Sequence, residues 1–291
     1  MYSIKLMTDS GSDVPKAFAA QHGIDVLPFP LAVAGEEFIP DDNFTNAMFY
    51  EILMKEPKIP THAQITTVEF MDKYEEYYKQ GYADLIYVSI NKLGSNTYNN
   101  AVLAKQQFFD EHPEATEKFS IHVVDSKIYS AGYGYPVMEA AKKIERGCSA
   151  KEILAYLDDW FDSVEIYFAP YSLEFVKKSG RVSCAAAFVG ELLGLKPIIC
   201  FVDGQVSIVE KVRGEKAIIP TLLKYAKNKM IPQTPYLFIT GCLPEESAKF
   251  KQEAEKVLGY ASEGSYEAGP VIAINAGPKL VAIVVKGHKK H

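Results

Sequence analysis

Residues 84–109 read DLIYVSINKLGSNTYNNAVLAKQQFF, and this segment contains the repeating unit of the fold. It begins with a short apolar run, Asp84–Ser89, whose length and composition are typical of a buried strand. A polar loop follows. In the next stretch, 98–109, apolar residues recur three or four positions apart, as on one face of a helix. A strand that leads through a polar loop into a helix indicates a parallel sheet covered by helices.

The same alternation extends on both sides of this segment. Further strands are predicted at residues 4–7, 24–28 and 121–124, and further helices at 15–21, 68–80, 131–146 and 150–163. We therefore expect residues 1–163 to form an N-terminal domain of the α/β class, a mostly parallel α/β sandwich.

The second half of the chain, residues 164–291, has a different pattern. Asp203-Gly204 separates two β runs, 197–202 and 205–209, and supplies the positive φ that a tight hairpin turn requires. The other expected elements are strands at 165–169, 236–240, 271–275 and 280–285 and helices at 215–228 and 245–258. We expect a C-terminal α+β domain with a mixed or antiparallel sheet. It should pack tightly on the first domain, because no Pro/Gly-rich linker separates the two.

Composition limits the classes of function. The chain has 291 residues, 48% of them hydrophobic, and can fill a substantial core. Its 31 basic and 37 acidic residues are mixed along the sequence, and the net charge of −6 argues against nucleic acid as a partner. No apolar run reaches the roughly 20 residues of a membrane-spanning helix, and the N-terminus does not resemble a signal peptide. Widely spaced cysteines exclude a CxxC motif, so we expect buried thiols in a cytoplasmic protein. We also expect the protein to be a monomer.

Motifs for common catalytic and cofactor sites are missing from the sequence. The chain contains no Walker loop, HExxH motif, EF-hand loop or GxSxG nucleophile elbow. We therefore expect neither a metal nor a cofactor. Ser95, His62 and Asp125 have the residue types of a catalytic triad, but residue type alone does not indicate that three side chains meet.

Hydroxyl-rich loops flank the predicted strands of the first half. They are Thr8-Asp9-Ser10, Thr61 with Thr66-Thr67, Ser95-Asn96-Thr97, and Asp125-Ser126. The carboxyl ends of parallel strands open into a common crevice, where hydroxyls and helix N-termini favour an anion. Each loop taken alone also fits a helix N-cap, because Ser, Thr and Asp are the preferred capping residues. The series as a whole indicates an anion site.

Eight motifs occur in an order and approximate spacing that resemble those of the DegV family of bacterial lipid-binding proteins. They are Thr8-Asp9-Ser10, residues 60–64, Ser95-Asn96-Thr97-Tyr98, Asp125-Ser126, residues 179–183, residues 195–198, Asp203-Gly204 and Gly277-Pro278. The resemblance implies two α/β domains with a lipid cavity between them, which encloses one long-chain fatty acid. It implies no catalysis by the protein itself. For some members it also implies a separate fatty acid kinase subunit that phosphorylates the bound carboxylate.

Three residues match family positions around the carboxylate. Ser95 matches a hydroxyl that holds the carboxylate, Thr61 lies in the loop that supplies a second hydroxyl, and Arg181 matches an arginine of the second domain. A buried carboxylate needs such partners, because an unpaired buried charge costs many kcal/mol. Arg181 also fits a simpler interpretation, in which it belongs to the cationic end of a helix that Gly180 caps.

At three further candidate fatty-acid-binding positions the chain departs from the family pattern. His62 replaces the usual threonine, so Thr61 could supply that hydroxyl only from one position earlier, and Asn96 replaces a glycine. Asn275 replaces a histidine that is associated with phosphoryl transfer. Asparagine can donate a hydrogen bond but cannot carry a charge near neutral pH. The resemblance therefore implies lipid binding more strongly than partnership with a kinase.

Two hypotheses follow. In the first, the protein is a lipid carrier without catalysis, and the apolar segments 185–188, 189–195 and 198–201 form the wall of the lipid tunnel; ordinary core explains these segments equally well. In the second, the protein is an enzyme that acts, as a hydrolase would, on a small carboxylated or phosphorylated substrate in the same crevice. That enzyme would need a general base, and Asp9, Asp125 and His62 are the obvious candidates. We favour the carrier.

Overall fold

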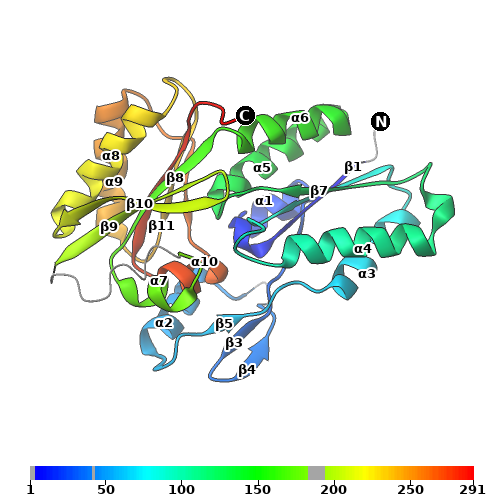
Figure 1. The fold of residues 1–291 in the computed structure, drawn as a ribbon, viewed down its shortest axis with the longest axis horizontal. Helices are drawn as coiled ribbons and strands as arrows, with labels where there is room; N and C mark the ends of the chain where they lie inside the picture. Colours follow the sequence, from blue (N-terminus) through cyan, green and yellow to red (C-terminus); the bar gives the residue numbers. More distant parts are fainter. Residues whose placement is uncertain (1–3, 41–42, 183–193) are drawn as a thin grey trace.

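The computed structural model describes residues 4–40, 43–182 and 194–291 (Figure 1). Its first half contains a four-stranded parallel sheet with the strand order β2-β1-β6-β7. The strands are β1 (Ile4–Asp9), β2 (Asp25–Leu27), β6 (Asp84–Ser89) and β7 (Ser120–Asp125). Helices α3 (Thr67–Lys79) and α4 (Thr97–Glu111) lie on one side of the sheet, and α5 (Ala131–Glu145) and α6 (Ala150–Phe161) on the other, with α1 (Lys16–Gln21) between β1 and β2 in the chain.

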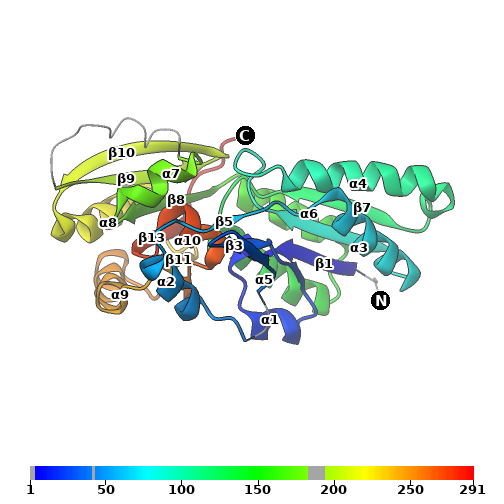
Figure 2. The same cartoon turned by 90° about the horizontal axis from the view of Figure 1, so that it is seen from below.

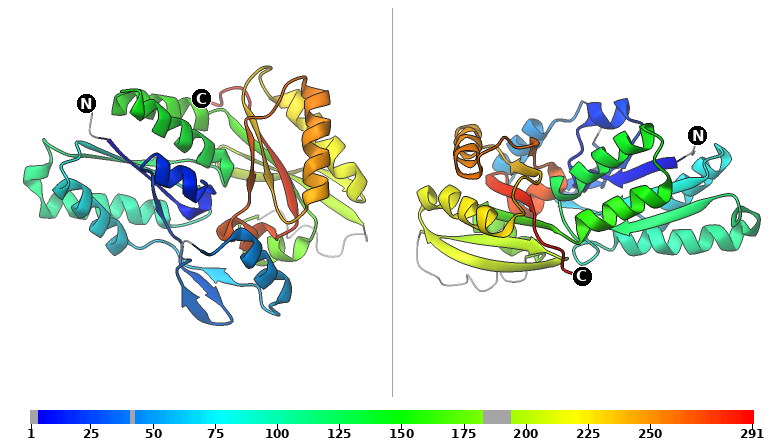
Figure 3. Two further views of the ribbon diagram at one scale, coloured as in Figure 1. Left: turned by 180° about the vertical axis from the view of Figure 1, so that it is seen from behind. Right: turned by 90° about the horizontal axis from the view of Figure 1, so that it is seen from above.

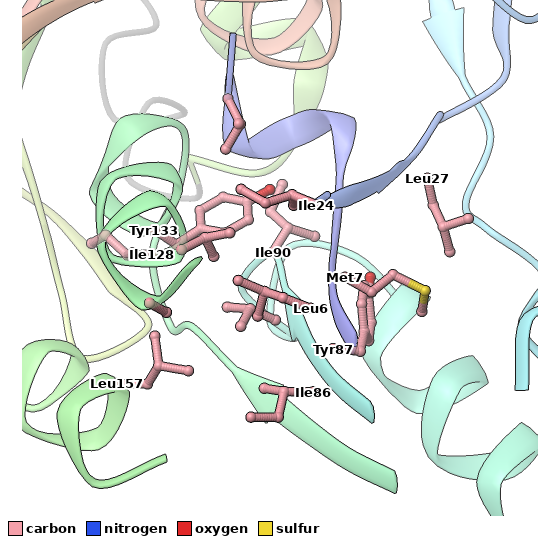
Figure 4. Close-up of a cluster of buried hydrophobic side chains, with 14 of the residues drawn as sticks. Leu6, Met7, Ile24, Leu27, Ile86, Tyr87, Ile90, Ile128, Tyr133 and Leu157 are labelled. Atoms are coloured by element: carbon pink, nitrogen blue, oxygen red, sulfur yellow. The ribbon is translucent and has the colours of Figure 1, made fainter. Parts of the chain in front are cut away.

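The central strands of this sheet are buried on both faces, which explains their continuous apolar runs. Leu6 pairs with Ile86, and Met7 pairs with Tyr87, so neighbouring pairs face opposite sides. Figure 4 shows Leu6 and Ile86 on the side of Leu157 from α6, and Met7 and Tyr87 on the other side. All five side chains are almost completely buried. The helices on both sides of this sheet are therefore held in place by the hydrophobic core that they cover.

The second half contains a six-stranded mixed sheet with the order β10-β9-β8-β13-β11-β12. Its strands are β8 (Val164–Pro170), β9 (Leu195–Val202), β10 (Gln205–Arg213), β11 (Tyr236–Thr240), β12 (Gly264–Glu267) and β13 (Leu280–Lys286). Only β11 and β12 pair in parallel; the other neighbours are antiparallel. Helices α8 (Ile218–Lys229) and α9 (Pro244–Leu258) cover its outer face (Figure 3). The expected fold class, α/β with a sheet-rich C-terminal part, is confirmed.

Strand β13 separates two hydrophobic clusters. Val281 and Ile283 belong to the cluster formed with α8 and α9, whereas Ala282 and Val284 belong to the large cluster that continues into the first half. Because successive side chains of a strand point to opposite faces, one strand contributes to both clusters. The inner face of the second sheet is thus packed against the first half.

A small antiparallel sheet, which sequence patterns do not predict, lies at the junction of the two halves (Figure 2). It consists of β3 (Leu31–Val33), β4 (Glu36–Phe38) and β5 (Thr61–His62), and helix α2 (Asn46–Lys55) lies between β4 and β5 in the chain. The hydroxyl of Tyr50 in α2 donates to the Ala268 carbonyl oxygen at 2.6 Å and so links this segment to the second half. Strands of two or three residues are too short to show a period in the sequence.

Residues 271–275 form part of a helix, so the predicted strand there is wrong. The helix is α10 (Pro270–Ala276); Pro270 occupies its first turn, where a missing N–H costs nothing, and Gly269 precedes it in an extended conformation. It packs against α7 (Leu173–Ser179) and α2. The apolar sequence of α10 suits a buried strand and a buried helix equally, and packing between two helices decides the outcome.

The predicted hairpin turn is confirmed, and its tip contacts the first half. Asp203 and Gly204 have φ angles of 46° and 75°, as a tight hairpin turn requires. The Gly204 N–H donates to the Lys127 carbonyl oxygen at 3.0 Å, and the Gly204 carbonyl accepts from Asn91 Nδ2 at 3.0 Å. Lys127 Nζ also lies 2.7 Å from Asp203 Oδ1. The β9–β10 hairpin is thereby attached to the loops that follow β6 and β7.

Candidate functional site

An apolar cavity lies between the two halves of the molecule. Together with its open mouth, it encloses about 750 Å³ of space that no atom of the protein occupies. Both halves contribute to its wall, which is formed by Phe29, His62, Ile90, Gly94, Ser95, Tyr129, Ser130, Ile166, Phe168, Arg181, Val182, Phe201, Ile239, Val271, Ile272, Asn275, Ala276, Leu280 and Ala282.

The inner face of the second sheet forms one side of this cavity. Phe168, Ala282 and Ile239 are direct cross-strand neighbours on β8, β13 and β11, and all three line the cavity. Phe168 stacks on Phe201 with ring centroids 5.3 Å apart, and Tyr129 packs edge-on against Phe201 at 4.9 Å. A small residue, Ala282, lies between larger neighbours and leaves room for a ligand. This wall is suited to a hydrocarbon chain.

A polar mouth adjoins the apolar cavity and shares His62, Ser95 and Arg181 with it. The mouth is completed by loop residues from both halves, among them Gln64 and Asn96. Gly94, next to Ser95, belongs to both spaces. A Cβ atom at position 94 would lie only 2.4 Å from the Tyr129 hydroxyl oxygen, so glycine permits the close approach of the loop to Tyr129. The site as a whole fits a ligand with an apolar tail and a polar head.

Of the six predicted site residues, five line this site and one does not. Asn275 lines the apolar cavity, Asn96 lines the mouth, and His62, Ser95 and Arg181 line both. Thr61 is exposed and lines neither space. Thr61 and His62 are successive residues of β5, so their side chains point to opposite faces, and His62 is the one on the cavity side. The expectation that Thr61 approaches the ligand is therefore not met by its position.

Ser95 lies at the start of α4. Its Oγ is 2.9 Å from the Thr97 hydroxyl oxygen and accepts a hydrogen bond from the Thr97 N–H at 3.3 Å. Asn96 occupies the N-cap position without a capping side-chain bond and instead contacts Asn99 and Asn100. The partial positive charge at this helix end favours an anion beside Ser95.

His62 and Asn275 form a hydrogen-bonded pair across the two halves. Asn275 Nδ2 lies 3.0 Å from His62 Nε2 and 2.7 Å from the Val271 carbonyl oxygen. Burial and the nearby Arg181 guanidinium lower the pKa of His62 to about 4, although the Ala63 carbonyl acts in the opposite direction. The ring is therefore neutral at neutral pH. Its Nδ1 atom is buried and forms no hydrogen bond with any residue that the structure describes.

Arg181 follows the end of α7 and remains available to a ligand. Gly180 ends the helix with a φ of 67°, and the Arg181 Nη1 atom donates to the Ser179 carbonyl oxygen at 2.7 Å. The helix-end interpretation is thus correct for the backbone, and Arg181 still lines the mouth. Within residues 4–40, 43–182 and 194–291, no carboxylate forms an ion pair with its guanidinium. An anionic ligand could supply the missing partner.

Ser95, His62 and Asp125 have the residue types of a catalytic triad, but the structure does not bring them together as one. Asp125 Oδ1 accepts from the backbone N–H groups of Lys92 and Lys127, and its Oδ2 lies 3.6 Å from Lys92 Nζ. The imidazole of His62 contacts Asn275 instead of a carboxylate. Without an orienting carboxylate, His62 lacks the arrangement of a triad base.

Two further properties of the described part of the chain bear on function. Among its residues, no group of three or more histidine, cysteine, aspartate or glutamate side chains could hold a metal ion. No helix in the same part has the length and apolar character needed to cross a membrane.

The prediction that three apolar segments form the tunnel wall agrees with the structure in part. Phe201 from segment 198–201 lines the cavity, whereas Ile198 faces the cluster under α8. Segment 185–188 and most of segment 189–195 lie outside the described residues. Sequence reasoning did not single out Tyr129, Phe168 or Ala282, because buried core residues and cavity-lining residues have the same apolar pattern.

Comparison with known proteins identifies relatives over the whole chain. The family model described as "Uncharacterised protein, DegV family" matches residues 3–287. A DegV domain-containing protein of Clostridium perfringens is 30% identical over 289 residues, which cover 97% of this chain and 98% of the relative. These matches span both halves of the molecule.

Solved structures have the same fold. A fatty acid binding DegV family protein from Thermus thermophilus is 26% identical, with a TM-score of 0.83, over 98% of this chain and 100% of that one. DegV from Bacillus subtilis, described as a fatty acid binding protein, is also 26% identical, with a TM-score of 0.81 over 99% and 100%. The family model, the sequence relative and the solved structures agree, and the chain belongs to the DegV family.

Proposed function

We propose that this protein binds one long-chain fatty acid, with the acyl chain in the apolar cavity and the carboxylate at the polar mouth. The observation that carries the proposal is the arrangement of the site: an apolar cavity adjoins a polar mouth, and His62, Ser95 and Arg181 line both. The two solved relatives described as fatty acid binding proteins support it.

The physical chemistry of a fatty acid matches this division. Each buried methylene contributes about 0.8 kcal/mol, so a chain of about 16 carbons offers on the order of 10 kcal/mol before ordering costs. The carboxylate needs hydrogen bonds or a cation once it leaves water. The Ser95 hydroxyl, the Arg181 guanidinium and the end of α4 provide such groups. The tail supplies most of the affinity, and the head supplies orientation.

We further propose that the protein is a monomeric cytoplasmic carrier without catalytic activity, made of two domains, 1–163 and 164–291, with the ligand between them. The strands of the parallel sheet all precede residue 126, and those of the six-stranded sheet all follow residue 163. The absence of a triad geometry around His62 supports a carrier over a hydrolase.

Mass spectrometry of the intact protein under non-denaturing conditions tests the function. Protein purified from growing cells should carry one additional mass equal to that of a C14–C18 fatty acid, and delipidated protein should regain it from palmitate. The same preparation should hydrolyse neither acyl esters nor ATP. A protein that takes up no fatty acid after delipidation, or an esterase activity that Ser95→Ala abolishes, would contradict the proposal.

Presentation of the lipid to a fatty acid kinase subunit is a separate proposal. In that reaction a carboxylate oxygen attacks the γ-phosphorus of ATP, and ADP leaves. Such a transfer depends on charge stabilisation, which the neutral amide of Asn275 provides poorly. Asn275→His should therefore raise the yield of acyl phosphate with a kinase subunit and leave the Kd for palmitate within about tenfold, or 1.4 kcal/mol.

The measurement is transfer of radiolabelled phosphate to bound palmitate, with the parent and the variant assayed side by side. A neutral histidine at position 275 can still donate one N–H to His62, so the fold around the pair should persist. Equal and rapid phosphorylation of palmitate in both proteins would mean that Asn275 does not lower the yield of acyl phosphate. Loss of palmitate from the variant would mean that Asn275 belongs to the binding shell instead.

A further inference from the structure

A second cleft lies beside the lipid cavity, among α1, the start of α2, strand β12 and the start of α10. Phe29 and Val271 line both the cavity and this cleft, so at these two positions a single residue separates the two spaces. Both residues are almost completely buried, with 1% and 2% of their surface exposed. The apolar lining of the second cleft includes the buried residues Val14, Ala19, Ile24 and Leu31.

A row of side chains on the inner face of the second sheet leads to this cleft. Phe168, Ala282 and Ile239 are successive cross-strand neighbours on the cavity wall. The next neighbour after Ile239 is Tyr266 on the edge strand β12, and Tyr266 lines the second cleft. Neighbouring strands lie about 4.8 Å apart, so the row from Phe168 to Tyr266 is about 14 Å long. An acyl chain that follows this row points its distal end at the second cleft.

The partition lies on the side of the cavity away from the mouth. Tyr129 of the mouth packs against Phe201 on β9, and β9 is four strand positions from β12. Helix α10 has the same direction: Asn275 contacts His62 of the mouth, whereas Val271, one turn earlier in the helix, belongs to the partition. The sheet and the helix therefore both place the second cleft beyond the distal end of the lipid cavity.

We propose that Phe29 and Val271 set the upper limit of acyl chain length, and that the second cleft becomes a subsite for the distal methylenes of longer acids when this partition is opened. The proposal rests on the proposed function. Apolar side chains line the space on both sides of the partition, so a methylene group finds a similar environment in each. The charged residues that line the second cleft are Asp13, Lys16 and Glu267. Their excess of negative charge disfavours a carboxylate head there and leaves the cleft suited to an uncharged tail.

Competition among acids of different length measures this limit. Delipidated protein is incubated with an equimolar mixture of saturated acids of 14 to 22 carbons, and mass spectrometry under non-denaturing conditions gives the ratio of bound C22 acid to bound C16 acid. In Phe29→Ala this ratio should rise more than about tenfold over the parent, because two methylenes that reach the second cleft are enough for that factor. The Phe29 ring also packs edge-on against His62, so Val271→Ala provides a second opening, which should raise the ratio while that contact stays in place.

Phe168→Ala is the matched control, because it removes the same ring from the cavity wall at a position that does not line the second cleft. Its C22 to C16 ratio should stay within about threefold of the parent. Ala20 is exposed on α1 and lines the second cleft, so Ala20→Phe refills the cleft and should abolish the gain of Phe29→Ala when the two are combined.

Thermal unfolding shows whether each variant is folded, and Phe29→Leu replaces Phe29→Ala if the larger truncation prevents folding. An unchanged ratio in both opened variants would overturn the proposal. So would an equal gain in Phe168→Ala, or a gain that persists after the cleft is refilled. A parent protein that binds none of the acids would contradict the proposed function instead.

Discussion

Replacing Ala282 by phenylalanine should reduce palmitate binding by more than 100-fold while a shorter acid such as decanoate still binds. Ala282 is buried on β13 and lies between Phe168 and Ile239 on the cavity wall. A phenyl ring there would occupy the space of several methylenes of the ligand. Loss of four buried methylenes removes about 3 kcal/mol, which exceeds a factor of 100 in Kd.

Isothermal titration with saturated acids of 8 to 18 carbons measures this effect. Ala282→Val should give an intermediate loss, because the valine side chain fills less of the cavity. Thermal unfolding of each variant controls for overpacking, which can itself destabilise a core by about 1–3 kcal/mol. If the Phe variant bound palmitate as tightly as the parent, the acyl chain would not lie along this wall. An equal loss for all chain lengths would indicate a damaged fold.

Removing two headgroup partners together, Ser95→Ala with Arg181→Met, should weaken palmitate binding by about 2–4 kcal/mol, or roughly 30- to 1,000-fold. A hydrogen bond to a charged group contributes about 1.5–3 kcal/mol, and two neighbouring partners are not fully additive. Ser95 is half-buried beside the buried Thr97, whereas Arg181 is exposed at the mouth, so Ser95 should account for the larger part. Exposed charges are screened by solvent and salt.

Methyl palmitate serves as the matched ligand, because it keeps the tail and lacks the negative charge. Its Kd should change less than about fivefold between the parent and the double variant. Thr61→Val is the control in the protein and should leave both values unchanged. If the double variant had the same Kd for palmitate as the parent, the carboxylate would not bind at this mouth.

Much of the fold could be predicted because its local patterns agree with its packing. The strand expected at 84–89 is β6, and the helix expected at 98–109 is α4, Thr97–Glu111. The Asp203-Gly204 turn was predictable because backbone conformation alone decides it. Helix α10 was not, because the sequence around Val271 fits either state and its neighbours α2 and α7 select the helix.

The candidate site could be predicted only through the resemblance to a family. Single residues such as Ser95 fit an N-cap as well as a ligand, and only the series of motifs distinguishes the two. The choice between Thr61 and His62 depends on which face of β5 is turned inward, and a two-residue strand gives no pattern to show this. The hydrogen bond between His62 and Asn275 depends on the approach of α10, which no sequence pattern indicates.

The contribution of β13 to two clusters has a consequence for the cooperativity of unfolding. Its alternate side chains complete the core under α8 and α9 on one face and the core shared with the parallel sheet on the other. Unfolding either half therefore exposes apolar surface of the other half to water, and this costs about 25 cal/mol of free energy per Å². We therefore expect the two halves, although they differ in topology, to unfold together as one foldon, because unfolding of one half alone has a high free-energy cost.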